Sequence, residues 1–212
     1  MPPDPMMIER ARGLSYIGPR KGCILAVMAE AFAQMGPGTV AARHWRTRRQ
    51  RPYLTMRQAA IFCFGRKCMT PDDRWAFAQW PDEDSPVDVV CRQQRPDDTM
   101  HFEFVQLKEV VPAELNPDQT IQSVLDRLPQ RYPRASGITI AINLNRDLTT
   151  PLDTLRMPAL PGVSLWLFGQ GGEPNDSFLF GDLLAAPMRC SFNYPRAYPG
   201  ESPTRWTSLL DD

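Results

Sequence analysis

The sequence contains few lysines and histidines and no long apolar segment. Only three of its 24 basic residues are lysines, and it has two histidines. No apolar run approaches the roughly 20 residues that a helix needs to cross a bilayer. The first residues lack the basic start and the apolar stretch of a secretory signal. These absences argue against a membrane protein or a membrane partner and predict a cytoplasmic location.

The five cysteines form an odd and scattered set, which favours reduced thiols over a disulfide framework. Cys63 and Cys68 have a spacing that zinc knuckles use, but neither His44 nor His101 has a second ligand nearby, so buried thiols are favoured over zinc. The sequence also lacks a Walker-type loop, a GxGxxG fingerprint and a serine nucleophile elbow. Nucleotide-cofactor and acyl-transfer chemistry therefore have no support.

The composition is that of a globular protein. Hydrophobic residues make up 42% of the 212 residues and charged residues 23%. A chain of this length fits in one domain, and no internal repeat or hinge-like linker divides it. We expect a single domain over residues 1–212 with four parts: a leading helix at about 22–35, an arginine-rich segment at 43–67, a core at about 85–145, and C-terminal strands with an extended tail at 160–212.

The formal net charge is zero, but the charges are unevenly distributed. No acidic residue lies between Glu30 and Asp72, whereas that segment holds eight positive charges. A basic stretch with aromatic residues in it is typical of phosphate contact. We assign nucleic-acid binding to Arg46, Arg48, Arg49 and Arg51. The alternative is a solvated arginine-rich loop that pairs with acids elsewhere in the chain.

Lysine is rare enough that one position stands out. Lys108 is the only lysine after Lys67, although arginine is common there. Lysine differs from arginine in being a compact ammonium with a pKa that its surroundings can shift. Lys108 is therefore a candidate for proton transfer or for close approach to a phosphate.

The first third of the chain has mixed secondary-structure signals. Apolar residues at helical spacing predict a helix over 22–35, whereas 53–64 fits either a helix or a strand. Thr70-Pro71-Asp72-Asp73 resembles a helix N-terminus, which predicts a short helix through Trp75 and Phe77.

The middle of the chain predicts a strand-strand-helix-strand unit. Residues 87–91 and 101–111 are strand-like and flank the turn residues 95–99, which indicates a β-hairpin. A helix capped at Asn116 leads to an apolar strand at 137–142, so the helix is a crossover between parallel strands. Further strands are expected at 163–168 and 177–180, followed by an extended, proline-rich end. The expected fold class is α/β with a mixed central sheet.

The hairpin brings three polar residues together. If the turn spans Arg95 to Thr99, Asp88 lies opposite Gln106, and Lys108 shares the face of Gln106 two residues on. A register shifted by one residue would move Asp88 to the other face. Glu103 and Glu109 belong to that other face and are left out of the site.

The three residues could support metal-dependent hydrolysis. The carboxylate of Asp88 and the amide oxygen of Gln106 are ligands that magnesium accepts, and Lys108 could orient or deprotonate a water. The alternative is a polar strand face that only confers solubility.

Pro86-Val87-Asp88, followed by Gln106-Leu107-Lys108, a helix and a parallel strand, resembles the PD-(D/E)XK nuclease superfamily with its restriction-endonuclease-like core. The resemblance covers about residues 85–145. It implies a mixed central sheet flanked by helices, Asp88 as the metal-binding acid, Gln106 in the position of the second acid and Lys108 as the catalytic lysine, with Mg²⁺ or Mn²⁺ as cofactor.

The chain departs from the family pattern in two places. The proline is one residue farther from Asp88 than in the motif, and Gln106 is an amide where a carboxylate is usual. The leading helix of the family often adds an acid, but Glu30 lies about 140° from the apolar face of its helix, so a solvated glutamate is favoured.

The expected function is a metal-dependent nuclease that hydrolyses phosphodiester bonds, with DNA favoured over RNA. One alternative is a catalytically inactive nuclease-like module that binds nucleic acid or a protein. Another is an interaction protein whose partner covers the C-terminal segment. The sequence leaves a homodimer open.

Overall fold

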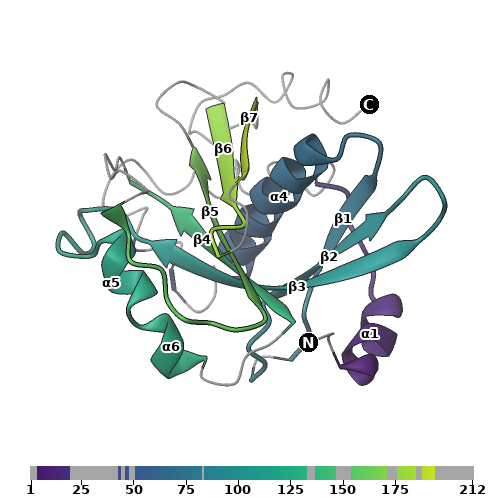
Figure 1. Ribbon diagram of the computed structural model, residues 1–212, viewed down its shortest axis with the longest axis horizontal. Helices are drawn as coiled ribbons and strands as arrows, with labels where there is room; N and C mark the ends of the chain where they lie inside the picture. The colour runs from purple at the N-terminus through teal and green to yellow at the C-terminus, as the bar shows by residue number, and fades with distance from the viewer. Residues whose placement is uncertain are drawn as a thin grey trace.

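The computed structural model describes residues 4–19, 43, 46–47, 51–82, 84–132, 137–146, 154–170, 176–184 and 188–193. They form an α/β protein in which a mixed sheet packs against helices (Figure 1). The helices are α1 (Pro5–Arg12), α4 (Arg51–Met69), α5 (Ile121–Leu125) and α6 (Leu128–Arg131). The strands are β1 (Arg74–Gln79), β2 (Val89–Gln94), β3 (Met100–Val110), β4 (Ile138–Leu144), β5 (Val163–Gln170), β6 (Asp176–Gly181) and β7 (Met188–Asn193).

The strands lie in the sheet in chain order. β3, β4 and β5 are parallel to one another, and every other neighbouring pair is antiparallel. The predicted hairpin (β2 and β3) and the predicted parallel pair (β3 and β4) are therefore confirmed, as are strands at β5 and β6. Among the described residues, no helix has the length and apolar character needed to cross a membrane.

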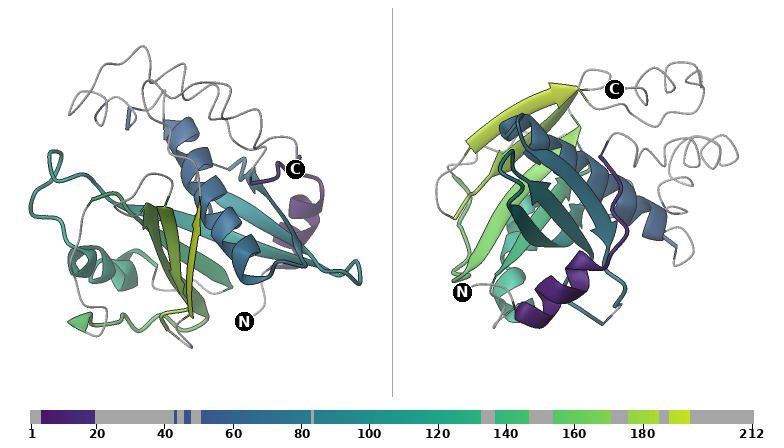
Figure 2. Two further views of the ribbon diagram at one scale, coloured as in Figure 1. Left: turned by 90° about the horizontal axis from the view of Figure 1, so that it is seen from above. Right: turned by 90° about the vertical axis from the view of Figure 1, so that its right-hand side faces the viewer.

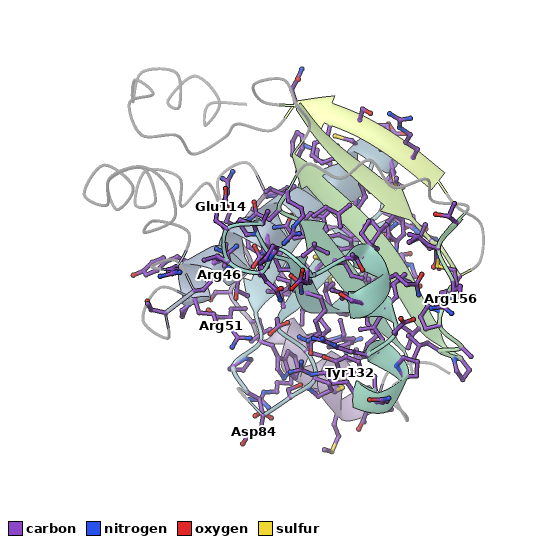
Figure 3. The ribbon with its side chains drawn as sticks, turned by 90° about the vertical axis from the view of Figure 1, so that its left-hand side faces the viewer. Arg46, Arg51, Asp84, Glu114, Tyr132 and Arg156 are labelled. Carbon is purple, nitrogen blue, oxygen red and sulfur yellow. The ribbon has the colours of Figure 1, made fainter. Side chains whose placement is uncertain are left out.

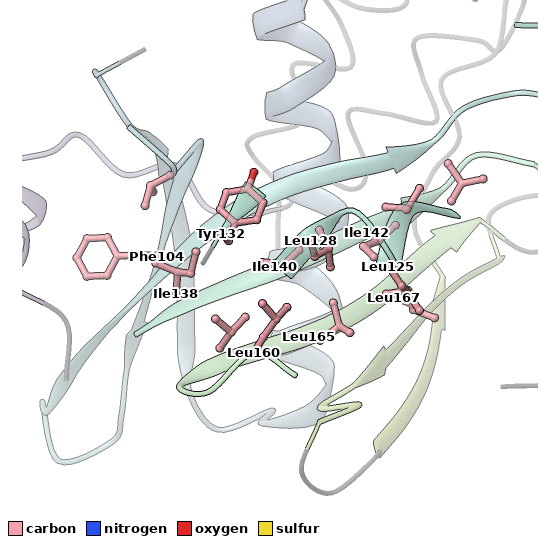
Figure 4. Close-up of a cluster of buried hydrophobic side chains, with 14 of the residues drawn as sticks. Phe104, Leu125, Leu128, Tyr132, Ile138, Ile140, Ile142, Leu160, Leu165 and Leu167 are labelled. Atoms are coloured by element: carbon pink, nitrogen blue, oxygen red, sulfur yellow. The ribbon is translucent and has the colours of Figure 1, made fainter. Parts of the chain in front are cut away.

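The two faces of the sheet carry separate cores. On β3, Val105 and Leu107 pack with α4, whereas Phe104 and Val110 pack with α5 and α6. Figure 4 shows the second of these clusters, between the short helices and β4 and β5. α4 contacts strands from both ends of the sheet, including β1 and β7, so the sheet curls around this helix (Figure 2). α4 is thus a central element of the fold.

The predicted short helix at Trp75 and Phe77 is wrong, because those residues belong to β1. Both side chains are buried, and the strand pairs along its whole length with β2. Thr70 to Asp73 forms the turn between α4 and β1, and the indole Nε1 of Trp75 donates to the Thr70 hydroxyl at 2.8 Å. A Thr-Pro-Asp-Asp sequence is compatible with a turn as well as with the start of a helix. The burial of Trp75 and Phe77, two residues apart, is the pattern of a strand.

The crossover helix is shorter than predicted and is divided in two. Its N-cap is Thr120 rather than Asn116, and Thr120 forms a reciprocal capping box with Ser123. The break between α5 and α6 falls at Asp126 and Arg127, and Pro129 in the first turn of α6 has no N–H to continue the hydrogen bonds of α5. The tail that was expected to be extended contributes strand β7. The predicted helix at 22–35, with Glu30, lies outside the described residues.

Replacing Gly181 with alanine is expected to destabilise the protein by about 1–3 kcal/mol. A Cβ atom at this position would overlap the ring of Trp166, which is 3% exposed and cannot move away easily. Urea unfolding checks this expectation, with Gly18→Ala as the control, because a Cβ atom there meets nothing within 4 Å. Equal unfolding midpoints for the two variants would contradict it.

Candidate functional site

A notch opens in the sheet where β2 begins beside β3. The β2–β3 ladder starts at Val89 opposite Val105, and the N–H of Asp88 donates to the Val105 carbonyl at 2.9 Å. β3 runs on to Val110 and pairs with β4 along that stretch. The other edge of β3 beyond Gln106 therefore has no partner from β2, and side chains fill the gap.

Asp88 completes the ladder with its side chain. Its Oδ2 accepts the backbone N–H of Leu107 at 2.7 Å and also accepts a hydrogen bond from the Nε2 of Gln106. The carboxylate thus occupies the position that a backbone carbonyl would have if β2 continued. The predicted register, with Asp88 beside Gln106, is confirmed by the pairing of Val89 with Val105.

The hydrogen bond between Gln106 and Asp88 joins the buried amide nitrogen of Gln106 to a half-buried carboxylate. Gln106 faces the carboxylate with its amide nitrogen, since two oxygens would repel each other. Its carbonyl oxygen makes no hydrogen bond to any described residue. A glutamate in this position would instead place two carboxylates side by side, which is unfavourable without a cation. Glutamine therefore stabilises the metal-free arrangement.

Lys108 lies on the same face as Gln106 and makes no ion pair with any described carboxylate. Its Nζ lies 5.1 Å from the centre of the Tyr132 ring. Burial, together with the charge of nearby Arg131, lowers the pKa of Lys108 to about 8, although the charge of Asp88 opposes the shift. Burial also raises the pKa of Asp88, against the hydrogen bond from Leu107 and the charge of Lys108.

Asp88 and Lys108 line a pocket of about 290 Å³ between α4, the hairpin and α6. Asp88, Lys108 and Glu109 come from the hairpin, whereas α4 contributes Arg51, Thr55 and Gln58, and α6 contributes Arg131. Together with Arg46, four cationic side chains and two carboxylates line the pocket. Its charge is therefore positive, which favours an anionic ligand.

Sequence reasoning missed the contribution of α4. Arg51, Thr55 and Gln58 are spaced i, i+4 and i+7 and therefore share one face of the helix. Gln58 is only 6% exposed and makes no hydrogen bond within the described part of the chain. A helical wheel over 51–69 would have grouped these residues, but the helix-or-strand ambiguity at 53–64 concealed them.

The predicted nucleic-acid-binding arginines fall into different environments. Arg46 pairs with Glu109 through Nε at 3.0 Å and through a second short contact, and Asn145 also donates to Glu109 at 2.8 Å. Glu109 thus lines the pocket, although the sequence placed it outside the site. Arg51 lies beside Arg46 at the start of α4 (Figure 3). Arg48 and Arg49 lie outside the described residues.

A second cavity, of about 310 Å³, is lined by residues at the opposite end of β3. Its main cation, Arg66, pairs with Glu103 at 3.1 Å and packs against the rings of Trp75 and Trp166. Glu103 also accepts the hydroxyl of Thr139. Among the residues described at its wall, this cavity therefore has one cation besides the Arg66–Glu103 pair, Arg95, whereas the cavity beside Asp88 has a larger excess of positive charge and is the better candidate for a functional site.

The pocket offers few metal ligands. Among the described residues, no group of three or more His, Cys, Asp and Glu side chains could hold a metal ion. Asp88 Oδ1 and the Gln106 carbonyl are hard oxygen donors, and Mg²⁺ commonly combines one carboxylate with waters and substrate phosphates. A magnesium ion at this place would therefore depend on waters and on a phosphate group for its other ligands.

Comparisons with protein-family models, with curated proteins and with solved structures found no match. A fold class alone does not define an activity, because one fold supports many functions. The function must therefore be inferred from the residues at the notch and from the charge of the pocket.

Proposed function

We propose that the chain is a metal-dependent nuclease of the PD-(D/E)XK type that hydrolyses phosphodiester bonds, with DNA as its substrate. The observation that supports this most strongly is that Asp88 and Lys108 line one pocket while Gln106 is hydrogen-bonded to Asp88 at its edge. They occur in the strand-strand-helix-strand order that the resemblance requires. In this proposal, α4 rather than 22–35 corresponds to the leading helix of the family.

In the proposed mechanism, the cationic side chains of Arg51 and Arg131 draw the phosphate into the pocket. Asp88 Oδ1 and the Gln106 carbonyl would hold Mg²⁺ or Mn²⁺, which when bound lowers the pKa of a water and stabilises charge on the phosphoryl oxygens. Lys108 accepts a proton from the attacking water, because burial favours its neutral amine more than in a solvated lysine.

The second candidate function is a catalytically inactive module that binds nucleic acid. It is favoured by the hydrogen bonding of Asp88, since Oδ2 already accepts from Leu107 and Gln106 and the pocket has no second unpaired carboxylate. This alternative predicts binding without cleavage in either metal.

Replacing Lys108 with arginine is expected to lower the cleavage rate about 100-fold. Arginine keeps the positive charge, but its guanidinium does not release a proton in this pH range. Initial rates on labelled DNA in Mg²⁺ measure the effect. Lys67→Arg, on the last turn of α4 and away from the pocket, is the matched control. A fully active Lys108→Arg protein would exclude Lys108 as the base.

A further inference from the structure

Three cations of the pocket have no acidic partner in the described part of the chain. Arg51, Lys108 and Arg131 come from α4, β3 and α6, and none of them forms an ion pair with a described carboxylate. Arg46 differs, because Glu109 neutralises it. The three side chains are therefore available to an anion.

Neutral donors lie beside these cations. Gln58 is 6% exposed as a whole residue, lines the pocket and makes no hydrogen bond to the described residues. Thr55 lies one turn earlier on the same face of α4 and also lines the pocket. Buried polar groups normally have partners, so an unpartnered amide at a cavity wall indicates a polar ligand. An amide N–H₂ and a hydroxyl can both donate to phosphate oxygens.

The charge balance indicates which kind of phosphate fits. Three unpaired cations oppose the single charge of Asp88, so the pocket carries an excess of about two positive charges. An internal phosphodiester has one negative charge, whereas a phosphate monoester approaches two above a second pKa of about 6. A monoester therefore matches the pocket better than a diester does.

We propose that this pocket binds the terminal phosphate monoester of a nucleic-acid strand, and that it does so without a metal ion. The choice of nucleic acid as the ligand rests on the proposed function. Hydrolysis of a phosphodiester breaks one P–O bond, and it leaves a phosphate monoester on one product end and a hydroxyl on the other. The phosphorylated product end would then compete with the substrate for the pocket.

Fluorescence anisotropy in EDTA tests the proposal with labelled oligonucleotides of one sequence that carry a 5′-phosphate, a 3′-phosphate or hydroxyls at both ends. One phosphorylated form should bind about tenfold more tightly than the hydroxyl form, the effect of roughly one extra charge pair. This preference should grow between pH 5 and pH 7, because the monoester gains its second charge there.

Substitutions of the pocket arginines test whether the preference for a phosphorylated end arises in this pocket. Arg131→Gln should abolish the preference for the phosphorylated end. Arg51→Gln removes a cation on a different helix and should also reduce this preference. Arg156→Gln is the matched control, because this arginine is exposed and lies outside the pocket (Figure 3). A preference that persists in both pocket variants would overturn the proposal.

Further arms separate this inference from the nuclease proposal. The absence of an end preference in the wild type, or a preference that requires Mg²⁺, would overturn the inference even if cleavage occurs. Inorganic phosphate or a mononucleotide that binds as tightly as the oligonucleotide would overturn the assignment to a nucleic-acid strand. An end preference in a protein that cleaves nothing would support the phosphate site and refute the nuclease.

Discussion

Replacing Asp88 with asparagine is expected to lower the rate of metal-dependent cleavage at least about 100-fold. Asparagine retains an oxygen that can accept the N–H of Leu107, so the β2–β3 junction should remain folded. Among the described residues that line the pocket, it removes the one carboxylate that is not in an ion pair. Without this charge, no remaining side chain at the notch can balance a divalent cation. Initial rates on labelled DNA across a Mg²⁺ titration measure the loss.

The matched control is Asp84→Asn. Asp84 is exposed on the segment that precedes β2 and does not line the pocket (Figure 3). This variant should cleave at the wild-type rate. Circular dichroism melts of both variants separate a chemical effect from unfolding. A folded Asp88→Asn protein with more than half of the wild-type rate would show that Asp88 is not the metal-binding acid.

Replacing Phe62 with alanine is expected to cost about 3–5 kcal/mol of unfolding free energy. The Phe62 side chain is fully buried on α4 and lies between two aromatic rings of β5. Its ring centre lies 6.0 Å from that of Trp166 and 5.8 Å from that of Phe168. Deleting the ring leaves a cavity between the central helix and the sheet that curls around it. Chemical denaturation of the purified variant gives the loss directly.

Tyr53 provides the comparison on the same helix. It is 40% exposed, so Tyr53→Ala should change the unfolding free energy by no more than about 0.5 kcal/mol. Comparable losses in the two variants would mean that α4 is not held by Phe62. Because α4 also carries Arg51, Thr55 and Gln58, loosening this helix should also reduce oligonucleotide binding.

The hairpin could be predicted from the sequence because its signals are local and agree with one another. Val89 and Val90 are β-branched, and the segment from Arg95 to Thr99 has turn chemistry, with Asp98 at a φ of 62°. Once the turn is fixed, the two-residue period of the strands determines that Asp88 meets Gln106. The same reasoning could not determine that Gln106 donates its amide nitrogen to Asp88.

The contribution of the two helices to the pocket could not be predicted, because it depends on tertiary packing. Gln58 reaches the notch only because α4 lies across the face of the sheet that contains Leu107. Arg131 lines the same pocket as Lys108 because it ends α6, a separate short helix that the local signals did not distinguish from α5. The local signals of Trp75 and Phe77 were misleading for the same reason, since pairing with β2 decides their conformation.

Cleavage by the wild-type protein tests the nuclease proposal most directly. A panel of labelled single- and double-stranded DNA and RNA would be incubated with Mg²⁺, with Mn²⁺ and with EDTA, alongside Asp88→Asn and Lys108→Arg. The account predicts cleavage of DNA that requires metal and is lost in both variants. Wild-type protein that binds these nucleic acids but cleaves none of them, or cleavage that both variants retain, would contradict it.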